Sequence, residues 1–316
     1  ERVEEVRRRV GLARAAGLEG VELLGPREAA ERFPLLDPSA ILAASLVPSD
    51  GAARGALVAA SLARRASDAG IAFERDVTVT GFEVRDGRVR AVLTDRGRVA
   101  CERVLLCAGI EGAALGALAG VAVPLVAVRQ TLTWSDSIAS VGEKSLPVLR
   151  HGDASLILHQ RAERVGVVTR REEPFAAEVE RVFPGLRGTF RTSEPATTWS
   201  VAATTDGAAL VGESASVRGF WLCEAVPFAL AAGMAQQVVE WMVAGEPSSD
   251  LSEVDANRAY PFETAEPFVR AVATGRFLRG DDIVHPLERP SAPRDLRLPP
   301  MSERERALGA AFTTEA

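Results

Sequence analysis

The hydrophobic pattern of this chain is clearest between residues 73 and 109. Apolar and polar residues alternate there, and Asp86–Gly87 and Asp95–Gly97 interrupt the alternation with residues typical of tight turns. Three antiparallel strands in succession are therefore expected. The continuous apolar run Val104–Cys107 follows, as in a strand that is covered on both faces. Ala108–Gly109 ends this run with almost no side chain, so a ligand could come close to the backbone there.

Apolar residues recur at helical spacing in four other stretches, which end at glycine or before proline. The small residues of stretch 55–70 predict a helix that lies close on a sheet, and Ile71–Phe73 predicts that a strand follows it. The four predicted helices are 1–17, 26–32, 55–70 and 231–243.

Residues 121–200 differ from the rest, because short apolar runs alternate with charged loops. This pattern is typical of a largely antiparallel sheet. The predicted elements are strands at 124–134, 146–149, 155–159 and 165–169, and a short helix near 174–182.

The earlier character returns after residue 204. A turn at Thr205–Gly207 and a short apolar run lead to the predicted buried strand Gly219–Cys223, which precedes the helix 231–243. A strand, a small-residue loop and a helix start form a corner whose unpaired N–H groups suit an anion or a flat ring. Close packing explains Ala232 and Gly233 equally well.

Composition excludes several classes of protein. The chain has 316 residues, 47% hydrophobic and 25% charged, which is ordinary for a globular protein. A net charge of −6 argues against nucleic acid or an anionic membrane as a partner. The charged start without Met is no signal peptide and indicates a piece of a longer protein.

The cysteines indicate a reducing environment. Cys101, Cys107 and Cys223 are scattered among apolar residues, so we expect buried thiols in a protein of the cytoplasm. They show no spacing typical of metal ligands, so we expect no metal site.

Several motifs follow one another in an order that is more specific than any one of them. Together they resemble the C-terminal flavin motif of D-amino-acid-oxidase-type flavoproteins, and within these the sarcosine and dimethylglycine dehydrogenase branch. The segments are Thr205–Glu213, Val217–Trp221, Ala232–Met242 and Gly245–Pro247, with Phe33–Asp37, Pro48–Gly51, Leu146–Arg150 and Asp282–Leu287 in further agreement. The family's glycine-rich phosphate loop and its folate domain are not in this sequence.

This resemblance implies FAD as cofactor and a small-molecule amine as substrate. Members of the family move a hydride from the N-methyl carbon of an amino acid to the flavin. Many pass the one-carbon fragment to tetrahydrofolate in a C-terminal domain, so tetrahydrofolate is an implied partner through a domain outside this chain. The implied cofactor-binding residues are Val79 on the adenine side, Ala108 and Gly109 beside the cofactor, and Ala232, Gly233 and Met234 under the flavin ring.

The resemblance also implies a fold of the α/β class with mixed α+β character. A partial FAD-binding, Rossmann-like domain is expected to combine with a mainly antiparallel substrate domain. The predicted parts are 1–50 (substrate-domain helices and cap), 51–120 (FAD-binding part), 121–203 (antiparallel substrate domain), 204–246 (C-terminal FAD-binding part) and 247–316 (extended linker arm).

The predicted catalytic residues are Arg129, Gln130 and His159. Arg129 offers bidentate geometry to a substrate carboxylate. His159 lies at a predicted strand end. The branch often has a histidine and a tyrosine facing the flavin where this sequence has Gln130 and Leu132, and an aromatic residue where it has Ile157.

These departures keep other hypotheses open. Loss of these polar groups removes orientation of the substrate and proton transfer, which typically contribute about 10²–10⁴-fold to the rate. A flavin-domain relic that serves as a structural or interaction module is therefore the alternative to an enzyme. A nicotinamide dehydrogenase is a third hypothesis, which the predicted three-stranded meander disfavours.

Overall fold

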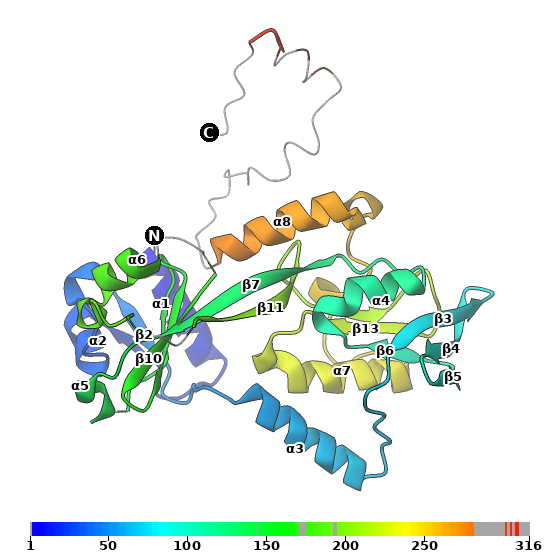
Figure 1. The fold of residues 1–316 in the computed structure, drawn as a ribbon, viewed down its shortest axis with the longest axis horizontal. Helices are drawn as coiled ribbons and strands as arrows, with labels where there is room; N and C mark the ends of the chain where they lie inside the picture. The colour runs from blue at the N-terminus through cyan, green and yellow to red at the C-terminus, as the bar shows by residue number, and fades with distance from the viewer. Residues whose placement is uncertain are drawn as a thin grey trace. The chain divides into compact units, whose positions relative to one another are not determined.

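The computed structural model describes residues 2–143, 145–170, 175–191 and 195–280, and residues 301, 304 and 307–309 of the C-terminal segment. The chain folds as two compact units, each built from discontinuous segments (Figure 1). Unit 1 comprises Glu1–Arg54, Arg129–Trp199 and Arg279–Val284; unit 2 comprises Gly55–Val128, Ser200–Leu278 and His285–Ala316.

Unit 2 is built around a three-stranded sheet in the order β12–β13–β6. The strands are β6 (Val104–Leu106), β12 (Leu210–Glu213) and β13 (Phe220–Glu224), with β13 parallel to β6 and antiparallel to β12. The apolar runs that predicted β6 and β13 supply their core residues: Leu106, Phe220 and Leu222 are buried in one cluster. Helices α4 (Gly112–Leu118) and α7 (Ala231–Ala244) lie on opposite sides of this sheet (Figure 1).

The predicted meander is confirmed as β3 (Val79–Arg85), β4 (Arg88–Thr94) and β5 (Gly97–Ala100), paired antiparallel. Phe82 of β3 packs edge-to-face on Phe220 of β13, with ring centroids 5.1 Å apart. Gly219 precedes β13 at a φ of 78°, and a Cβ there would lie 2.3 Å from the Glu102 carbonyl oxygen. A glycine therefore allows β13 to begin directly against the chain that enters β6.

The segment 247–280 differs from the extended arm that its composition predicts. It forms two short 3₁₀ turns and then helix α8 (Glu266–Arg279). Val269 and Ala273 of α8 are buried against Val126 and Val128. Burial of one apolar face thus makes this segment part of unit 2. Most of the arm beyond Gly280 lies outside the described residues.

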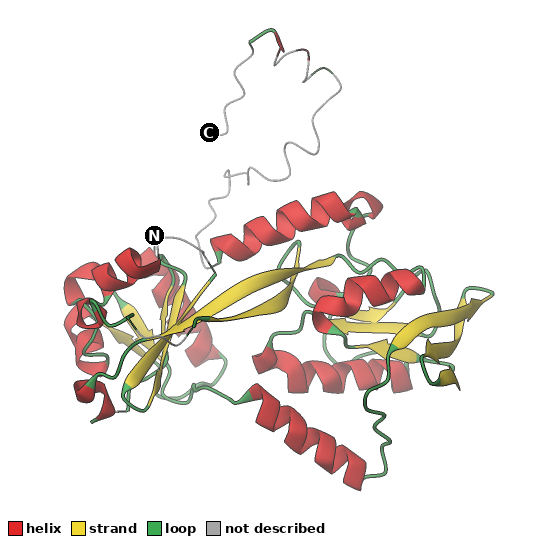
Figure 2. Ribbon diagram, in the orientation of Figure 1, coloured by secondary structure: helices red, strands yellow, loops and turns green. Residues whose placement is uncertain are grey.

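Unit 1 contains a five-stranded sheet in the order β11–β7–β10–β9–β8. Figure 2 draws strands in yellow and helices in red. The strands are β7 (Leu125–Trp134), β8 (Leu149–His151), β9 (Leu156–Arg161), β10 (Arg164–Thr169) and β11 (Thr197–Thr204); β7 and β11 each also extend into unit 2. The predicted antiparallel region is confirmed, although β8 begins at Leu149 and not at Leu146.

One face of this sheet is covered by the helices of unit 1. Leu156, Leu158, Val165 and Val167 point into a cluster that also buries Phe183. The surrounding elements are α1 (Arg2–Ala15), α2 (Pro26–Arg32), α5 (Ala139–Gly142), α6 (Phe175–Val182) and the strand pair β1 (Glu22–Leu24) and β2 (Ala44–Leu46).

Three further expectations about the fold are wrong. Helix α3 (Gly55–Asp68) forms as predicted but buries none of its residues, and Leu57 and Leu62 are each 60% exposed. Ile71–Phe73 forms no strand, because no neighbouring strand pairs with it in the described structure. The cysteines are not buried: Cys107 is exposed, and Cys101 and Cys223 are partly exposed. Within the described ranges, every helix is too short or too polar to cross a bilayer.

Candidate functional site

Strands β6 and β13 of unit 2 end side by side. The prediction that β6 is covered on both faces is wrong, because it lies at the edge of the described sheet and its Leu105 is 37% exposed. Val104, Leu105 and Leu106 of β6 pair in parallel with Phe220, Trp221 and Leu222 of β13. Because parallel strands end at the same edge of a sheet, Ala108–Gly109 and Glu224 come together there although they are more than a hundred residues apart in sequence. We call Cys107–Gly109 and Cys223–Glu224 the strand-end edge.

Glu224 holds this edge together, and the sequence analysis missed it. Its two carboxylate oxygens accept hydrogen bonds from the amides of Ala108 and Gly109, each at 2.6 Å. The side chain is buried, and burial raises its pKa although both amide hydrogen bonds act in the opposite direction. Gly112 makes room for the carboxylate, because a Cβ there would lie 2.8 Å from Oε1. The signal in the sequence was a charged residue directly after the apolar run 219–223.

The backbone at the edge is bare. Gly109 has a φ of 58°, and a Cβ built on it would meet no atom within 4 Å. Gly233, in the first turn of α7, is equally open. No side chain caps the N-terminus of this helix, whose dipole favours negative charge. This open backbone fits a flat dinucleotide, whereas the amides of Ala108 and Gly109 are already bonded to Glu224 and offer space, not hydrogen bonds.

The predicted cofactor residues fall into two groups. Ala232 and Gly233 lie exposed in the first turn of α7, and Met234 packs against the cluster that includes Cys223. These residues and Ala108–Gly109 all belong to the layers around β6 and β13. Val79 is different: it opens β3 and pairs with Thr94, so it belongs to the meander.

The predicted catalytic residues all lie in unit 1. Arg129 and Gln130 are consecutive on β7, so they point to opposite faces of the sheet. Arg129 is exposed and Gln130 is half-buried. Gln130 shares its face with Leu132 and Trp134, and we call this side, which is opposite the helix-covered face, the second face of the sheet.

His159 also lies on the second face. It is in the interior of β9 and not at a strand end, because β9 continues to Arg161. Across the sheet it pairs with Gly166, which pairs with Trp134. The His159 and Trp134 rings meet edge-to-face above that glycine, with centroids 5.0 Å apart. Burial lowers the pKa of His159, which keeps its imidazole neutral near neutral pH.

The next row of the second face is aliphatic. Leu132, Val168 and Ile157 are direct neighbours across β7, β10 and β9. The positions where the resembled branch often has aromatic residues therefore share one row. In this chain that row offers only apolar contact.

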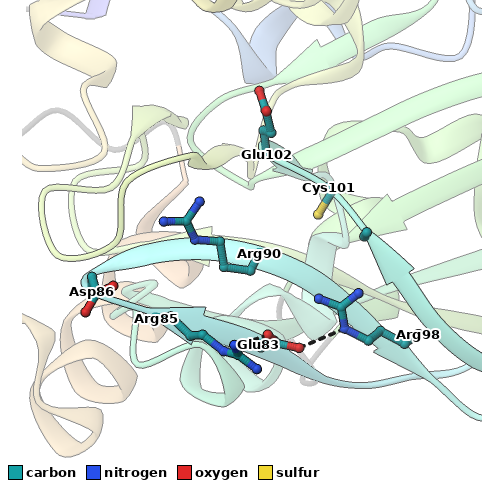
Figure 3. A pocket seen from close by; sticks show the side chains of 8 residues that line it. Glu83, Arg85, Asp86, Arg90, Arg98, Cys101 and Glu102 are labelled. Carbon is teal, nitrogen blue, oxygen red and sulfur yellow. Dashed lines mark hydrogen bonds and ion pairs between the residues drawn. The ribbon is translucent and has the colours of Figure 1, made fainter.

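A hollow of about 550 Å³ lies on the meander, away from the strand-end edge (Figure 3). Charged side chains line it, and Glu83 binds both Arg85 and Arg98 at 2.8–2.9 Å. The Arg98 hydrogen bond lowers the pKa of Glu83. Its three arginines face three carboxylates, so the charges balance and favour no charged ligand.

Several other polar and aromatic residues take part in turns or packing and not in the strand-end edge. Asp206 closes its turn by accepting from the Ala208 amide and pairs with Arg258 at 2.6 Å. The Nδ1 atom of His151 accepts from the Ala154 amide. Trp221 is buried against Trp241, whereas Trp199 is 36% exposed. His285 lies outside the described residues.

Comparison with known proteins supports the flavoprotein resemblance. The chain is 26% identical to human mitochondrial sarcosine dehydrogenase over 99% of its own length and 37% of that protein. It is 25% identical to the mouse mitochondrial pyruvate dehydrogenase phosphatase regulatory subunit over 92% of its length and 36% of that protein. The chain thus spans little more than a third of these relatives.

The fold has solved counterparts as well. The L-proline dehydrogenase of P. horikoshii superposes with a TM-score of 0.70 at 20% identity, covering 81% of this chain and 73% of that one. Residues 1–241 match the FAD dependent oxidoreductase family, and residues 244–298 match the FAD dependent oxidoreductase central domain. Since the first match includes about three quarters of the sequence, the chain belongs to the FAD dependent oxidoreductase family.

Proposed function

We propose that the protein containing this chain oxidises the CH–NH group of a small N-methyl amino acid with FAD. The observation that carries the proposal is the strand-end edge, where β6 and β13 end with open backbone beside the first turn of α7. Bound there, FAD would supply the hydride acceptor. Ala108, Gly109, Ala232, Gly233 and Met234 would hold it.

Gly109 and Gly233 serve this role by having no side chain, which leaves room for a ring or a phosphate to approach. Glu224 keeps the loop after β6 in place through its two amide hydrogen bonds. The uncapped N-terminus of α7 favours negative charge that develops on a nearby ligand.

The side chains of unit 1 support the choice of an amino-acid substrate. Arg129 is exposed and can pair with a carboxylate through two parallel hydrogen bonds. A substrate amine must lose its proton before a hydride can leave the neighbouring carbon. The neutral imidazole of His159 can accept that proton, and Gln130 on the same face can orient the amine. Arg129 points to the opposite face of the sheet, so a small substrate bound at Arg129 would not reach these two residues.

The alternative is a protein that keeps the flavin fold without turnover. Two observations favour it: the row Leu132–Val168–Ile157 is aliphatic, and one relative is named a regulatory subunit. A structural or interaction module would need the edge of unit 2 for folding but would need no polar groups on the second face.

Anaerobic titration of the full-length holoprotein separates the two functions. Sarcosine, dimethylglycine and a panel of primary and secondary amines would each be added while the visible flavin absorbance is recorded. Bleaching by an N-methyl amino acid supports the enzyme, and tetrahydrofolate added in a second assay tests for capture of the one-carbon product. A flavin that stays oxidised with every amine would contradict the enzyme and favour the module.

A further inference from the structure

Two cysteines from distant parts of the sequence lie next to each other at the strand-end edge. The parallel pairing of Leu106 with Leu222 places the following residues, Cys107 and Cys223, directly opposite. Paired residues in parallel strands point to the same face. Neighbouring strands are about 4.8 Å apart, which lies within the Cα separation of disulfides, about 4.4–6.8 Å.

The two thiols have different surroundings. Cys223 packs against the buried cluster of Ala209, Val211 and Val238, to which α7 contributes Val238. Cys107 is exposed at the end of β6. A reagent in solution can therefore reach Cys107 when no FAD occupies the strand-end edge, while Cys223 is held against the protein behind it.

The pKa shifts of the two thiols also favour Cys107 as the reactive cysteine. A hydrogen bond between the two thiols lowers the pKa of Cys107 and raises the pKa of Cys223. Burial and the charge of Glu224 act against ionisation of Cys107 but do not reverse the shift. The thiolate is the nucleophilic form of cysteine, so Cys107 is suited to attack and Cys223 to resolve.

We propose that Cys107 and Cys223 form an oxidisable dithiol that a hydroperoxide converts into a disulfide. The Cys107 thiolate attacks one peroxide oxygen, the O–O bond breaks, and an alcohol (water, for hydrogen peroxide) leaves as Cys107 becomes a sulfenic acid. The sulfur of Cys223 then attacks the Cys107 sulfur and loses its proton. The S–S bond forms and the hydroxyl leaves as water. Two thiols are oxidised and one peroxide is reduced.

The third cysteine provides a matched control. Cys101 is also partly exposed in unit 2, but burial raises its pKa, and it has no place in the strand-end edge. Hydrogen peroxide would be titrated into the full-length protein after removal of FAD, and the free thiols and intact mass would be followed. Cys101→Ser, Cys107→Ser and Cys223→Ser would be compared with the unchanged protein.

The proposal predicts that two thiols disappear together with a mass loss of about 2 Da, in the unchanged protein and in Cys101→Ser alike. In Cys223→Ser, oxidation is expected to stop at a sulfenic acid on Cys107 that dimedone traps. Cys107→Ser is expected to react with hydrogen peroxide at least tenfold more slowly than the unchanged protein. Equal oxidation rates at all three cysteines, or overoxidation of Cys107 without an internal disulfide, would overturn it.

A second measurement needs no variant. Iodoacetamide at neutral pH is expected to alkylate Cys107 at least tenfold faster than Cys101 in the unchanged protein, because the thiolate is the reacting form. Equal alkylation rates would also overturn the proposal. These readouts do not involve amine oxidation, so they stand apart from the test of the proposed function.

Discussion

The strand-end edge of unit 2 and the second face of the sheet in unit 1 differ in what they offer a ligand. The edge and the neighbouring start of α7 together offer backbone: Gly109 and Gly233 with open space, an uncapped helix N-terminus, and a buried carboxylate that fixes a loop. The second face offers side chains, and those of its aliphatic row are apolar. A family's cofactor site can thus depend on the absence of side chains, whereas its substrate site depends on which side chains are present.

The largest loss of stability is expected at Gly219, where the start of β13 lies directly against the backbone of Glu102. Gly219→Ala places a Cβ 2.3 Å from the Glu102 carbonyl oxygen at a φ of 78°. We expect a loss of about 3–5 kcal/mol in the free energy of unfolding, because a strained φ adds to a clash that cannot relax. Urea unfolding measures it.

Gly87→Ala is the matched control, since Gly87 has a φ of 68° and no atom within 4 Å of a Cβ. It should cost only about 1–2 kcal/mol. Equal losses in the two variants would show that the close approach at Gly219 does not matter.

The next largest effect is expected on the KM of a variant at Arg129 in unit 1. If the protein oxidises an amino acid, Arg129→Gln should raise KM for it by about 10–100-fold and change kcat little, because a charged hydrogen bond contributes about 1.5–3 kcal/mol. Steady-state kinetics check this. The same change at Arg90, on the meander, should leave KM unaltered. An unchanged KM in Arg129→Gln would remove Arg129 from the substrate site.

A smaller effect is expected at the crossing of His159 and Trp134. Gly166→Ala would place a Cβ 2.9 Å from Leu132 and Trp134 and 3.0 Å from His159. We expect a loss of about 1–2 kcal/mol by overpacking, measured by thermal unfolding. Gly11→Ala, in a helix with open space, should instead stabilise unit 1 by up to about 1 kcal/mol. Loss of stability in both variants would refute this packing argument.

The smallest effect is the pH dependence of Glu224. Its pKa is raised on folding, so the folded state binds more protons than the unfolded state above the ordinary value of 4.5, and stability falls as pH rises through the folded pKa. Glu224→Gln loses one amide hydrogen bond, which should cost about 1 kcal/mol at about pH 4. This cost should shrink towards neutral pH. A cost that grows with pH would contradict a raised pKa.

Much of the fold could be predicted from local pattern. The meander, β6, β13, α2 and α7 follow from alternation, continuous apolar runs and turn residues. The errors share one cause, since they depend on contacts with distant residues. Stretch 247–280 forms α8 because Val269 meets Val126, and α3 stays exposed although its sequence suits close packing.

Residues of the candidate site could be predicted where small side chains mark them. They could not be predicted where their role depends on which strands lie side by side. The small residues Ala108, Gly109 and Gly233 predicted open backbone, and a Cβ at Gly109 or Gly233 would indeed meet no atom within 4 Å. Their role in holding a cofactor stays a prediction. Glu224 was missed because its role exists only once β6 lies beside β13. The opposite orientation of Arg129 and Gln130 was predictable, because consecutive residues of the predicted strand 124–134 point to opposite faces.

The central claim is that open backbone at the strand-end edge and the start of α7 holds FAD. The most direct test is the flavin content of the full-length protein with Gly233→Leu, against Gly11→Leu, since both are helical glycines with no atom within 4 Å of a Cβ. We expect Gly233→Leu to fold normally and to bind FAD at least tenfold more weakly, while Gly11→Leu keeps its full flavin content. Full flavin content in folded Gly233→Leu would contradict the account.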